Sequence, residues 1–467
     1  MKLTKNGYTI KKEEYTLDEI KQIKSDLTIK PFVLNDFGKQ TDNKFTIYLE
    51  SPSKLYIPRF YGLEKFGNPS INTLEGEKIN IHFNGGLRKE QEPIFDITYN
   101  QLLTKGGGII SLKCGGGKTV LALYVLCQLN YKTIVVVHKD FLMTQWYDRI
   151  KEFIPDAKIG KIQQNTIDIE GKDIILAMVQ SLSMKEYHKD TFKSFGLAIF
   201  DECHHLGAEI FQKCMSKVQS KYMLGLSATP NRKDRCSKVF EWYIGPIAYM
   251  TKDKNKDYIE VNILNYECED IKYNKAESMY NGKPCCPKMI NNICNYLPRS
   301  NLIINEIKKF YEEGRDILYL SDRRENLNYI HKQLNTFNID SGFYVGGMKP
   351  AGLRESQEKR VILGTFSMAS EGMDIPHLNT IILGSPKSDI VQSVGRILRQ
   401  KKEKRKFHPL IYDINDDFSI FKNQFKKRLK YYEKQNFDIY LIKDNIKNKY
   451  ESKKKSKKTL DLTQCLI

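Results

Sequence analysis

The strongest constraint on the fold of this chain is a glycine-rich turn between an apolar run and a helical pattern. The segment LKCGGGKT at residues 112–119 follows the apolar residues 108–111 and precedes the helical pattern of residues 120–126. Glycines let backbone N–H groups turn inward around phosphate oxygens, and the N-terminus of a helix adds a positive dipole end. The order of strand, turn and helix therefore predicts a phosphate-binding loop made by Cys114, Gly115, Gly116, Gly117, Lys118 and Thr119.

Two side chains at the end of this turn have the chemistry that a nucleoside triphosphate needs. Lys118 could reach the β- and γ-phosphates as a point charge, and the Thr119 hydroxyl could bind Mg²⁺. Leu112 stands where the first glycine of such loops is usual. A glycine-rich turn that binds nothing therefore stays open as an alternative at this point.

Composition limits the class of protein and its partners. A chain of 467 residues is too long for one hydrophobic core, so we expect two or three domains. Hydrophobic residues at 40% and aromatic residues at 11% argue against extended disorder, and apolar runs that alternate with helical patterns predict an α/β fold. The formal net charge of +19 favours a polyanionic partner, with nucleic acid ahead of a membrane surface.

The sequence has no signal of export or of membrane insertion. The N-terminus lacks the apolar core of a signal peptide, and no apolar run approaches the span of a bilayer. Cys114 and Cys203 stand inside two motifs that a disulfide would distort, which indicates a reducing compartment. Cys285, Cys286 and Cys294 form the one cysteine cluster, and their spacing fits no zinc site. We therefore expect a soluble, intracellular protein.

A second motif is acidic and follows a predicted strand. The apolar runs 133–137, 173–176, 196–200 and 222–226 predict buried parallel strands, and the third ends in the sequence DECH of residues 201–204. Open α/β sheets bind ligands at the carboxyl ends of their strands. Asp201 could hold Mg²⁺ through water, and Glu202 could polarise an attacking water. Alone, this motif could be an exposed acidic turn; the glycine-rich loop upstream favours a site.

Two further groups have a place in such a site. Ser227 and Thr229 follow the strand at 222–226, and their hydroxyls could bond to His204 and transmit the state of the γ-phosphate. A simple turn explains them equally well in isolation. Gln91 could lie against the edge of an adenine, because its amide has one donor and one acceptor side.

A second series of strand and helix patterns begins near residue 300 and ends with basic residues. In a helix, Gln392, Arg396 and Arg399 fall at i, i+4 and i+7 and line one face. Two guanidinium groups on one face have two interpretations. They could be a solvated basic edge, or they could be arginine fingers that reach a triphosphate.

The ordered set of motifs resembles a known family over about residues 85–425. It is similar to the superfamily 2 helicases of the DExH type, in the branch of the eukaryotic repair and transcription helicase, the phage UvsW helicase and the transcript-release helicases of large DNA viruses. The motifs that carry the resemblance are Gln91, the loop at 112–119, the DECH motif at 201–204, the SAT motif at 227–229, residues 365–374 and residues 392–399.

The resemblance implies an α/β fold with two tandem RecA-like parallel-sheet domains that bind ATP and Mg²⁺. It implies phosphate and metal contacts by Lys118 and Thr119, a metal role for Asp201 and a catalytic base at Glu202. The other implied roles are coupling by His204, Ser227 and Thr229, sensing of ATP and strand by Gly372 and Asp374, and catalysis by Gln392, Arg396 and Arg399. His138 and Met178 depart from the family pattern, which has proline and threonine there.

The resemblance also implies partners and a location. We expect an ATP-dependent helicase or translocase on nucleic acid, with DNA favoured over RNA, no membrane, and transcription or repair proteins as further partners. A cytoplasmic or viral compartment follows from the viral relatives. The alternatives are an ATP-dependent RNA helicase and a non-catalytic nucleic-acid-binding protein with a degenerate nucleotide site.

The expected domain organisation has five parts. They are an N-terminal accessory domain at 1–82, a RecA-like ATP-binding domain at 83–250, a linker or insertion at 251–299, a second RecA-like domain at 300–425 and a basic helical or disordered tail at 426–467. The segment 54–61 mixes bases with aromatic residues, and we prefer an ordinary core edge to a nucleic-acid surface there. Apolar residues at positions 421, 425, 429 and 432 predict a helix that packs on the second domain.

Overall fold

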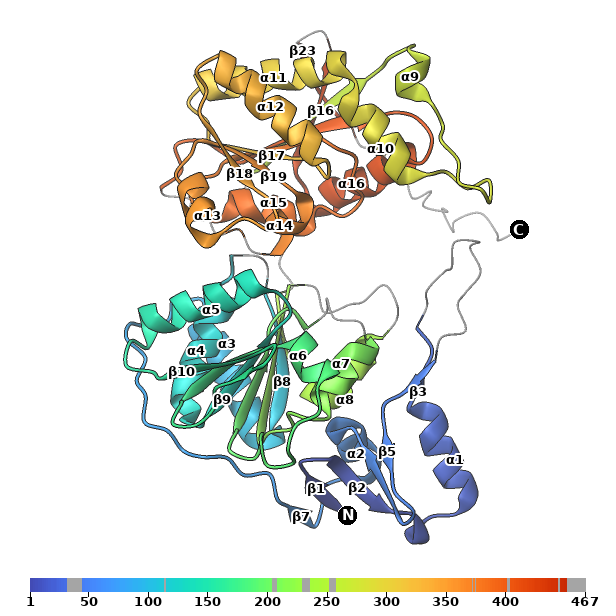
Figure 1. Ribbon diagram of the computed structural model, residues 1–467, viewed down its shortest axis with the longest axis vertical. Coiled ribbons are helices and arrows are strands. Elements are labelled where there is room, and N and C mark those ends of the chain that lie inside the picture. The colour runs from blue at the N-terminus through green and yellow to red at the C-terminus, as the bar shows by residue number, and fades with distance from the viewer. Residues whose placement is uncertain are drawn as a thin grey trace, which may run out of the picture. The chain divides into compact units, whose positions relative to one another are not determined.

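The chain forms two compact units in the computed structural model, Met1–Lys252 and Asp253–Ile467. Each unit is built around its own mostly parallel eight-stranded sheet (Figure 1). The structure describes residues 1–31, 44–112, 115–203, 208–228, 236–251, 258–371, 373, 375–400, 404–443 and 446–451.

The sheet of the first unit has the strand order β11-β10-β12-β9-β13-β14-β8-β15. All neighbouring strands are parallel except β10 and β11. Its strands are β8 (Gly107–Ser111), β9 (Thr133–Val137), β10 (Ile159–Gln163), β11 (Thr166–Ile167), β12 (Ile174–Met178), β13 (Leu197–Phe200), β14 (Tyr222–Ser227) and β15 (Ile247–Met250). The four strands predicted from apolar runs are confirmed as β9, β12, β13 and β14.

Helices cover both faces of this sheet (Figure 1). Ile134 and Val136 of β9 belong to one hydrophobic core, and Val135 and Val137 belong to the other. A strand with a core on each face reads as a continuous apolar run, which explains the sequence pattern. The helices are α3 (Glu92–Lys105), α4 (Lys118–Leu129) and α5 (Asp140–Phe153) on one face, and α6 (Val179–Met184), α7 (Ala208–Met215) and α8 (Ser237–Ile244) on the other.

The N-terminal residues are not a separate domain, contrary to the expectation for residues 1–82. They form a small sheet of order β5-β6-β2-β1-β7, and their apolar side chains share one core with α7 and α8. The ring of Tyr61 lies edge-on against Trp242 of α8, with 5.3 Å between centroids. The elements are β1 (Lys2–Thr4), β2 (Gly7–Lys11), α1 (Leu17–Asp26), β3 (Thr28–Ile29), β4 (Phe45–Thr46), β5 (Leu49–Glu50), β6 (Lys54–Ile57), α2 (Arg59–Phe66) and β7 (Ile71–Asn72).

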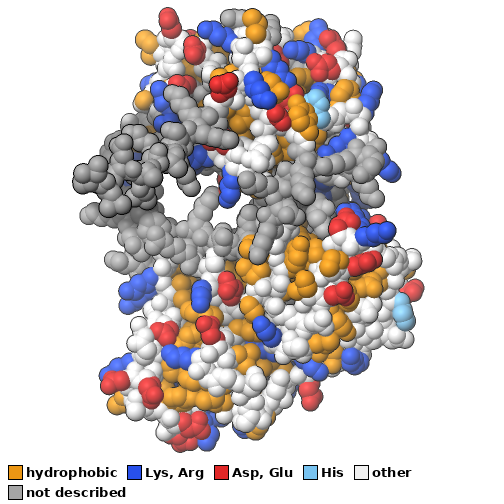
Figure 2. All heavy atoms as spheres, turned by 180° about the vertical axis from the view of Figure 1, so that it is seen from behind, with side chains coloured by type: hydrophobic (Ala, Val, Ile, Leu, Met, Phe, Trp, Pro, Cys, Tyr) orange, Lys and Arg blue, Asp and Glu red, His pale blue; other side chains and the backbone are white. Residues whose placement is uncertain are grey.

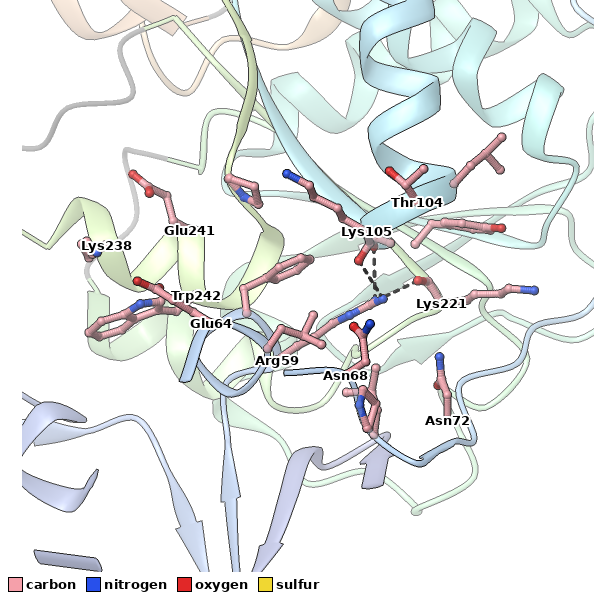
Figure 3. A pocket seen from close by; sticks show the side chains of 18 residues that line it. Arg59, Glu64, Asn68, Asn72, Thr104, Lys105, Lys221, Lys238, Glu241 and Trp242 are labelled. Carbon is pink, nitrogen blue, oxygen red and sulfur yellow. Dashed lines mark hydrogen bonds between the residues drawn. The ribbon is translucent and has the colours of Figure 1, made fainter. Parts of the chain in front are cut away.

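Arg59 holds α2 against the first sheet. Its guanidinium donates to the carbonyl oxygens of Lys105 at 3.1 Å, Gly106 at 3.2 Å and Lys221 at 2.9 Å, beside a cavity of about 630 Å³ (Figure 3). Two of these carbonyls lie at the C-terminus of α3, where a cation is favourable. The base-and-aromatic segment 54–61 is therefore a core edge, as we preferred.

The sheet of the second unit has the strand order β18-β19-β17-β20-β21-β16-β22-β23, and only β22 and β23 pair antiparallel. Its strands are β16 (Glu260–Tyr266), β17 (Ile317–Leu320), β18 (Ser341–Tyr344), β19 (Val361–Gly364), β20 (Thr380–Leu383), β21 (Leu410–Asp416), β22 (Asp438–Lys443) and β23 (Ile446–Lys449). Its helices are α9 (Ile271–Asn274), α10 (Cys286–Asn295), α11 (Leu297–Glu312), α12 (Arg324–Thr336), α13 (Pro350–Gln357), α14 (Phe366–Glu371), α15 (Val391–Val394), the 3₁₀ helix η3 (Gly395–Leu398) and α16 (Phe421–Gln435). Among the described helices, none is both long enough and apolar enough to cross a bilayer.

The structure corrects the expected boundaries of the second domain. The segment 251–299 was expected to be a linker or insertion, but it contains β16, which lies between β21 and β22 in the sheet. Arg299 also forms a fully buried ion pair with Asp416 of β21, with 2.7 Å between Nε and Oδ1. The tail begins later than residue 426, because α16 continues to Gln435 and β22 and β23 complete the sheet. The lysine-rich segment 453–458 lies outside the described residues.

The helix predicted from the apolar spacing at 421–432 is confirmed as α16, with a different buried face. Phe421 and Tyr432 are buried, as expected. The third buried residue is Arg428, which bonds to Asp413 of β21 with 2.8 Å between Nε and Oδ2. The apolar stripe therefore includes one charged residue whose partner lies in the sheet.

Candidate nucleotide site

Three of the predicted motifs lie at one edge of the first sheet. The loop at 112–117 follows β8, Asp201 and Glu202 follow β13, and Ser227 ends β14, which lies between the other two strands. The backbone N–H of Leu112 donates to the carbonyl of Ser227 at 3.1 Å. This is the carboxyl edge of a parallel sheet, where α/β proteins bind ligands.

Two glycines of the loop are required by backbone conformation or by the closeness of a neighbouring side chain. Gly115 and Gly117 have φ angles of 78° and 75°, in the left-handed region that favours glycine. A Cβ atom at Gly117 would collide with Nε2 of Gln91. Lys118 then begins α4, so that the loop ends at the N-terminus of a helix.

Gln91 is buried against this loop. Its Nε2 donates to the carbonyl oxygens of Gly116 at 3.4 Å and Gly117 at 3.3 Å, and its Oε1 accepts from the backbone N–H of Arg88 at 3.1 Å. Both ends of the amide thus contact the chain itself. The contact of Gln91 with an adenine edge stays a prediction.

An ion pair joins the loop to the acidic motif. Nζ of Lys118 lies 3.3 Å from Oε1 of Glu202, and both side chains are largely buried. Nζ also donates to the carbonyl of Leu112 at 3.4 Å. Glu202 has a φ angle of 45°, which residues other than glycine seldom adopt. The strand end thus directs a carboxylate at the lysine that we expect to bind phosphate.

Asp201 is buried and accepts two N–H groups. Its Oδ2 accepts from Nε1 of Trp146 at 2.8 Å, and its Oδ1 accepts from the backbone N–H of Glu202 at 2.9 Å. Burial raises the pKa of Asp201 to about 6, and the charge of Glu202 adds to this, while the Trp146 hydrogen bond acts in the opposite direction. Each carboxylate oxygen keeps acceptor capacity after one such bond.

These residues fit a magnesium ion that is bound mainly by phosphate. Mg²⁺ prefers oxygen ligands and usually takes one or two protein side chains together with substrate phosphates and water. The Asp201 carboxylate and the hydroxyl of Thr119, the second residue of α4, are such ligands. Within the described part of the chain, no group of three or more His, Cys, Asp or Glu side chains could hold a metal alone. The donor set therefore suits a metal that enters with a nucleotide.

The basic residues of the second unit lie at a change of helix type. Gln392 lies in α15, Arg396 in η3 and Arg399 directly after it, so the α-helical spacing is broken. Arg396 is only 5% exposed, and its guanidinium donates to the carbonyls of Ala369 and of Met373, the latter at 2.9 Å. Gln392 and Arg399 are half-buried. Side chains three residues apart eclipse in a 3₁₀ helix, so the common face expected for Gln392, Arg396 and Arg399 stays a prediction.

Five residues named from the sequence lie outside the described residues, and one partner was missed. The five are Cys114, His204, Thr229, Gly372 and Asp374. The missed partner is Trp146, whose link to Asp201 no spacing rule predicts. The signal available was the residue type, because a buried indole N–H usually finds an acceptor.

The two departures from the family pattern lie beside the site. His138 follows β9, and its carbonyl accepts from Nε2 of Gln180 in α6 at 3.0 Å. Met178 is the last residue of β12 and is buried. Gln180, two residues after Met178, thus holds the turn after β9 by its hydrogen bond to His138.

This chain is similar to a protein family, to named viral proteins and to a solved structure. The family described as "Type III restriction enzyme, res subunit" matches residues 84–232. A protein of Acanthamoeba polyphaga mimivirus, named "Putative ATP-dependent RNA helicase", is 38% identical over 96% of this chain and 89% of its own length. A protein of African swine fever virus with the same description is 25% identical over 78% of this chain and 75% of its own length. The crystal structure of T4 UvsW covers 91% of this chain and 95% of its own at 18% identity, with a TM-score of 0.38.

Proposed function

The chain belongs to the superfamily 2 helicases, in the viral branch, and from this premise we propose that it is an ATP-driven motor that moves along or separates strands of nucleic acid. A helicase of this family hydrolyses ATP and acts on nucleic acid. The observation that carries the proposal for this chain is the Lys118–Glu202 ion pair, which brings a phosphate-binding cation and a candidate base together at one sheet edge.

We propose that the ion pair of Lys118 and Glu202 breaks when ATP binds. An entering triphosphate competes with Glu202 for Lys118, because the phosphate oxygens are also anionic. When Lys118 moves to the phosphates, the carboxylate of Glu202 is released to orient the attacking water. Asp201 and Thr119 would hold Mg²⁺, which when bound neutralises charge on the phosphate oxygens. His204, Ser227 and Thr229 would report the presence of the γ-phosphate.

The residues of the second unit are proposed to complete catalysis. The guanidinium of Arg396 donates to the backbone carbonyls of Ala369 and Met373, which suits a structural role for this residue. We assign the charge that stabilises the transition state to Arg399, with Gln392 beside it, and the sensing of ATP and strand to Gly372 and Asp374. This assignment rests on the family resemblance.

Two nucleic acids are candidate substrates. The motif resemblance to DNA-acting helicases favours DNA. The relatives from mimivirus and African swine fever virus are named as RNA helicases, which favours RNA. In Figure 2, basic and acidic side chains are interspersed over the visible surface of the described residues.

One assay tests the proposal and separates the substrates. ATP hydrolysis would be measured with single-stranded DNA, duplex DNA, branched DNA and RNA at one fixed salt concentration, because phosphate contacts depend on salt. We expect hydrolysis that is stimulated by nucleic acid, with DNA above RNA. Greater stimulation by RNA would assign the second candidate, and no hydrolysis with any of them would indicate a non-catalytic binding protein.

A further inference from the structure

Trp146 contacts the candidate metal-binding carboxylate directly. This residue of α5 is 1% exposed, and its Nε1–H donates to Oδ2 of Asp201 at 2.8 Å. The chain has one other tryptophan, Trp242 of α8, whose ring lies against Tyr61. The two tryptophans therefore have different surroundings within the same unit.

The contact fixes the orientation of Asp201 from two sides. A carboxylate can rotate about its bond to Cβ, and a single hydrogen bond restrains this rotation only weakly. Here Oδ2 accepts from Trp146 and Oδ1 accepts from the backbone N–H of Glu202. Because each oxygen of Asp201 accepts one N–H, the carboxylate is fixed in one orientation. Its remaining lone pairs are then available to a ligand from one direction.

Both residues of this contact are held by the first sheet. The backbone N–H of Asp201 donates to the carbonyl of Val136 in β9 at 3.0 Å. The helix that carries Trp146 begins three residues after β9 and packs on the sheet through Leu142 and Ile150, which are buried in the same core as Trp146. The donor and the acceptor are thus both anchored to one central strand.

We propose that Trp146 is a positioning residue for divalent-cation binding, which acts by holding the carboxylate of Asp201 in the orientation that receives the Mg²⁺ of a bound nucleotide. The inference rests on the proposed function, because it needs a nucleotide at Lys118. Hydrogen-bond partners of metal ligands typically change metal affinity by about 10–100-fold when they are removed.

The test uses Trp146→Phe, which keeps an aromatic ring and removes the N–H. Binding of a fluorescent ATP analogue is titrated in EDTA, and Mg²⁺ is then titrated at saturating analogue. We expect Trp146→Phe to bind the analogue in EDTA as the wild type does, and to need about 10–100-fold more Mg²⁺ for half-saturation. Trp242→Phe makes the same chemical change away from the site and should leave both values unchanged.

The outcomes separate this inference from the proposed function. If the wild type responds to Mg²⁺ and Trp146→Phe needs the same concentration, the positioning role is wrong while the nucleotide site stands. If the wild type binds no analogue, the proposed function fails and the inference fails with it.

A second measurement decides the matter if Trp146→Phe does not fold. In the Trp242→Phe protein, Trp146 is the sole tryptophan, and its emission reports the charge next to its N–H. We expect Mg²⁺ to shift this emission when the analogue is already bound. An emission that does not change on addition of saturating Mg²⁺ would overturn the inference.

Discussion

Nζ of Lys118 lies 3.3 Å from Oε1 of Glu202, so the lysine of the glycine-rich loop and the carboxylate of the acidic strand end neutralise each other. The two residues follow β8 and β13, which are separated in the sheet by β14. The pair lies at the carboxyl edge of a parallel sheet, where ligands bind. When an anionic ligand enters, Lys118 can exchange Glu202 for the ligand.

Replacement of Lys118 by alanine should weaken nucleotide binding. The substitution removes the cation and leaves Glu202 to repel the phosphates, so we expect the dissociation constant for ATP to rise by about tenfold or more. Equilibrium titration with a fluorescent ATP analogue measures it. Lys172→Ala is the matched control, because Lys172 pairs with Asp168 across 3.5 Å at the surface. Equal affinity in the Lys118 variant and the control would contradict the assignment.

The two arginines near residue 400 should give different phenotypes. Arg396→Ala removes a buried guanidinium and leaves two carbonyls without their donor, so the second unit should lose about 2–4 kcal/mol of unfolding free energy.

Arg399→Ala should cost less than about 1 kcal/mol and leave nucleotide affinity nearly intact. Its stimulated hydrolysis should fall about 10³-fold or more. Denaturant titration and phosphate release measure these effects, and an unchanged rate would make Arg399 part of a solvated edge.

The buried ion pair of Arg299 and Asp416 should be important for the stability of the second unit. Both side chains are fully buried, so Arg299→Ala leaves an unpaired buried carboxylate and should cost about 3–5 kcal/mol. The exposed pair of Lys308 and Glu312 provides the control, because Lys308→Ala should cost less than about 1 kcal/mol. Urea denaturation measures both. Similar small losses for both variants would contradict a stabilising role of the buried pair.

The raised pKa of Asp201 should make the free energy of unfolding depend on pH in the absence of divalent cations. Burial raises its pKa from 3.8 to about 6, so the folded chain holds the proton more tightly than the unfolded chain. Its contribution to stability is complete below pH 3.8 and is lost as the pH rises through about 6. Relative to Asp201→Asn, which cannot ionise, the wild type should lose about 2–3 kcal/mol over this window. Urea titrations at several pH values measure it, and parallel stability curves would refute the shift.

The sequence was most informative where one local pattern determines the structure. The strand at Thr133–Val137 is predicted to its last residue, because a strand buried on both faces is almost entirely apolar. At positions 115 and 117, glycine permits the left-handed φ angles of the loop without steric cost, so the residue type indicated the tight turn.

Contacts between distant residues account for what the sequence did not reveal. Strand β16 contains the buried polar residues Glu260 and Asn262 and thus lacks an apolar run. Glu260 is paired with Lys447, 2.6 Å away, and with His408, 3.2 Å away. No local pattern indicates partners so far along the chain. The donation from Trp146 to Asp201 escaped prediction for the same reason.

The most direct test of the central claim is the rate of phosphate release by Glu202→Gln at saturating Mg²⁺, ATP and nucleic acid. This variant keeps the shape of the side chain and removes the charge that orients water. Glu152→Gln, on the exposed face of α5, is the control. The account predicts that Glu202→Gln binds ATP while its turnover falls by about 10²–10⁴-fold, with the control at the wild-type rate. Turnover of Glu202→Gln near that of the wild type would contradict the account.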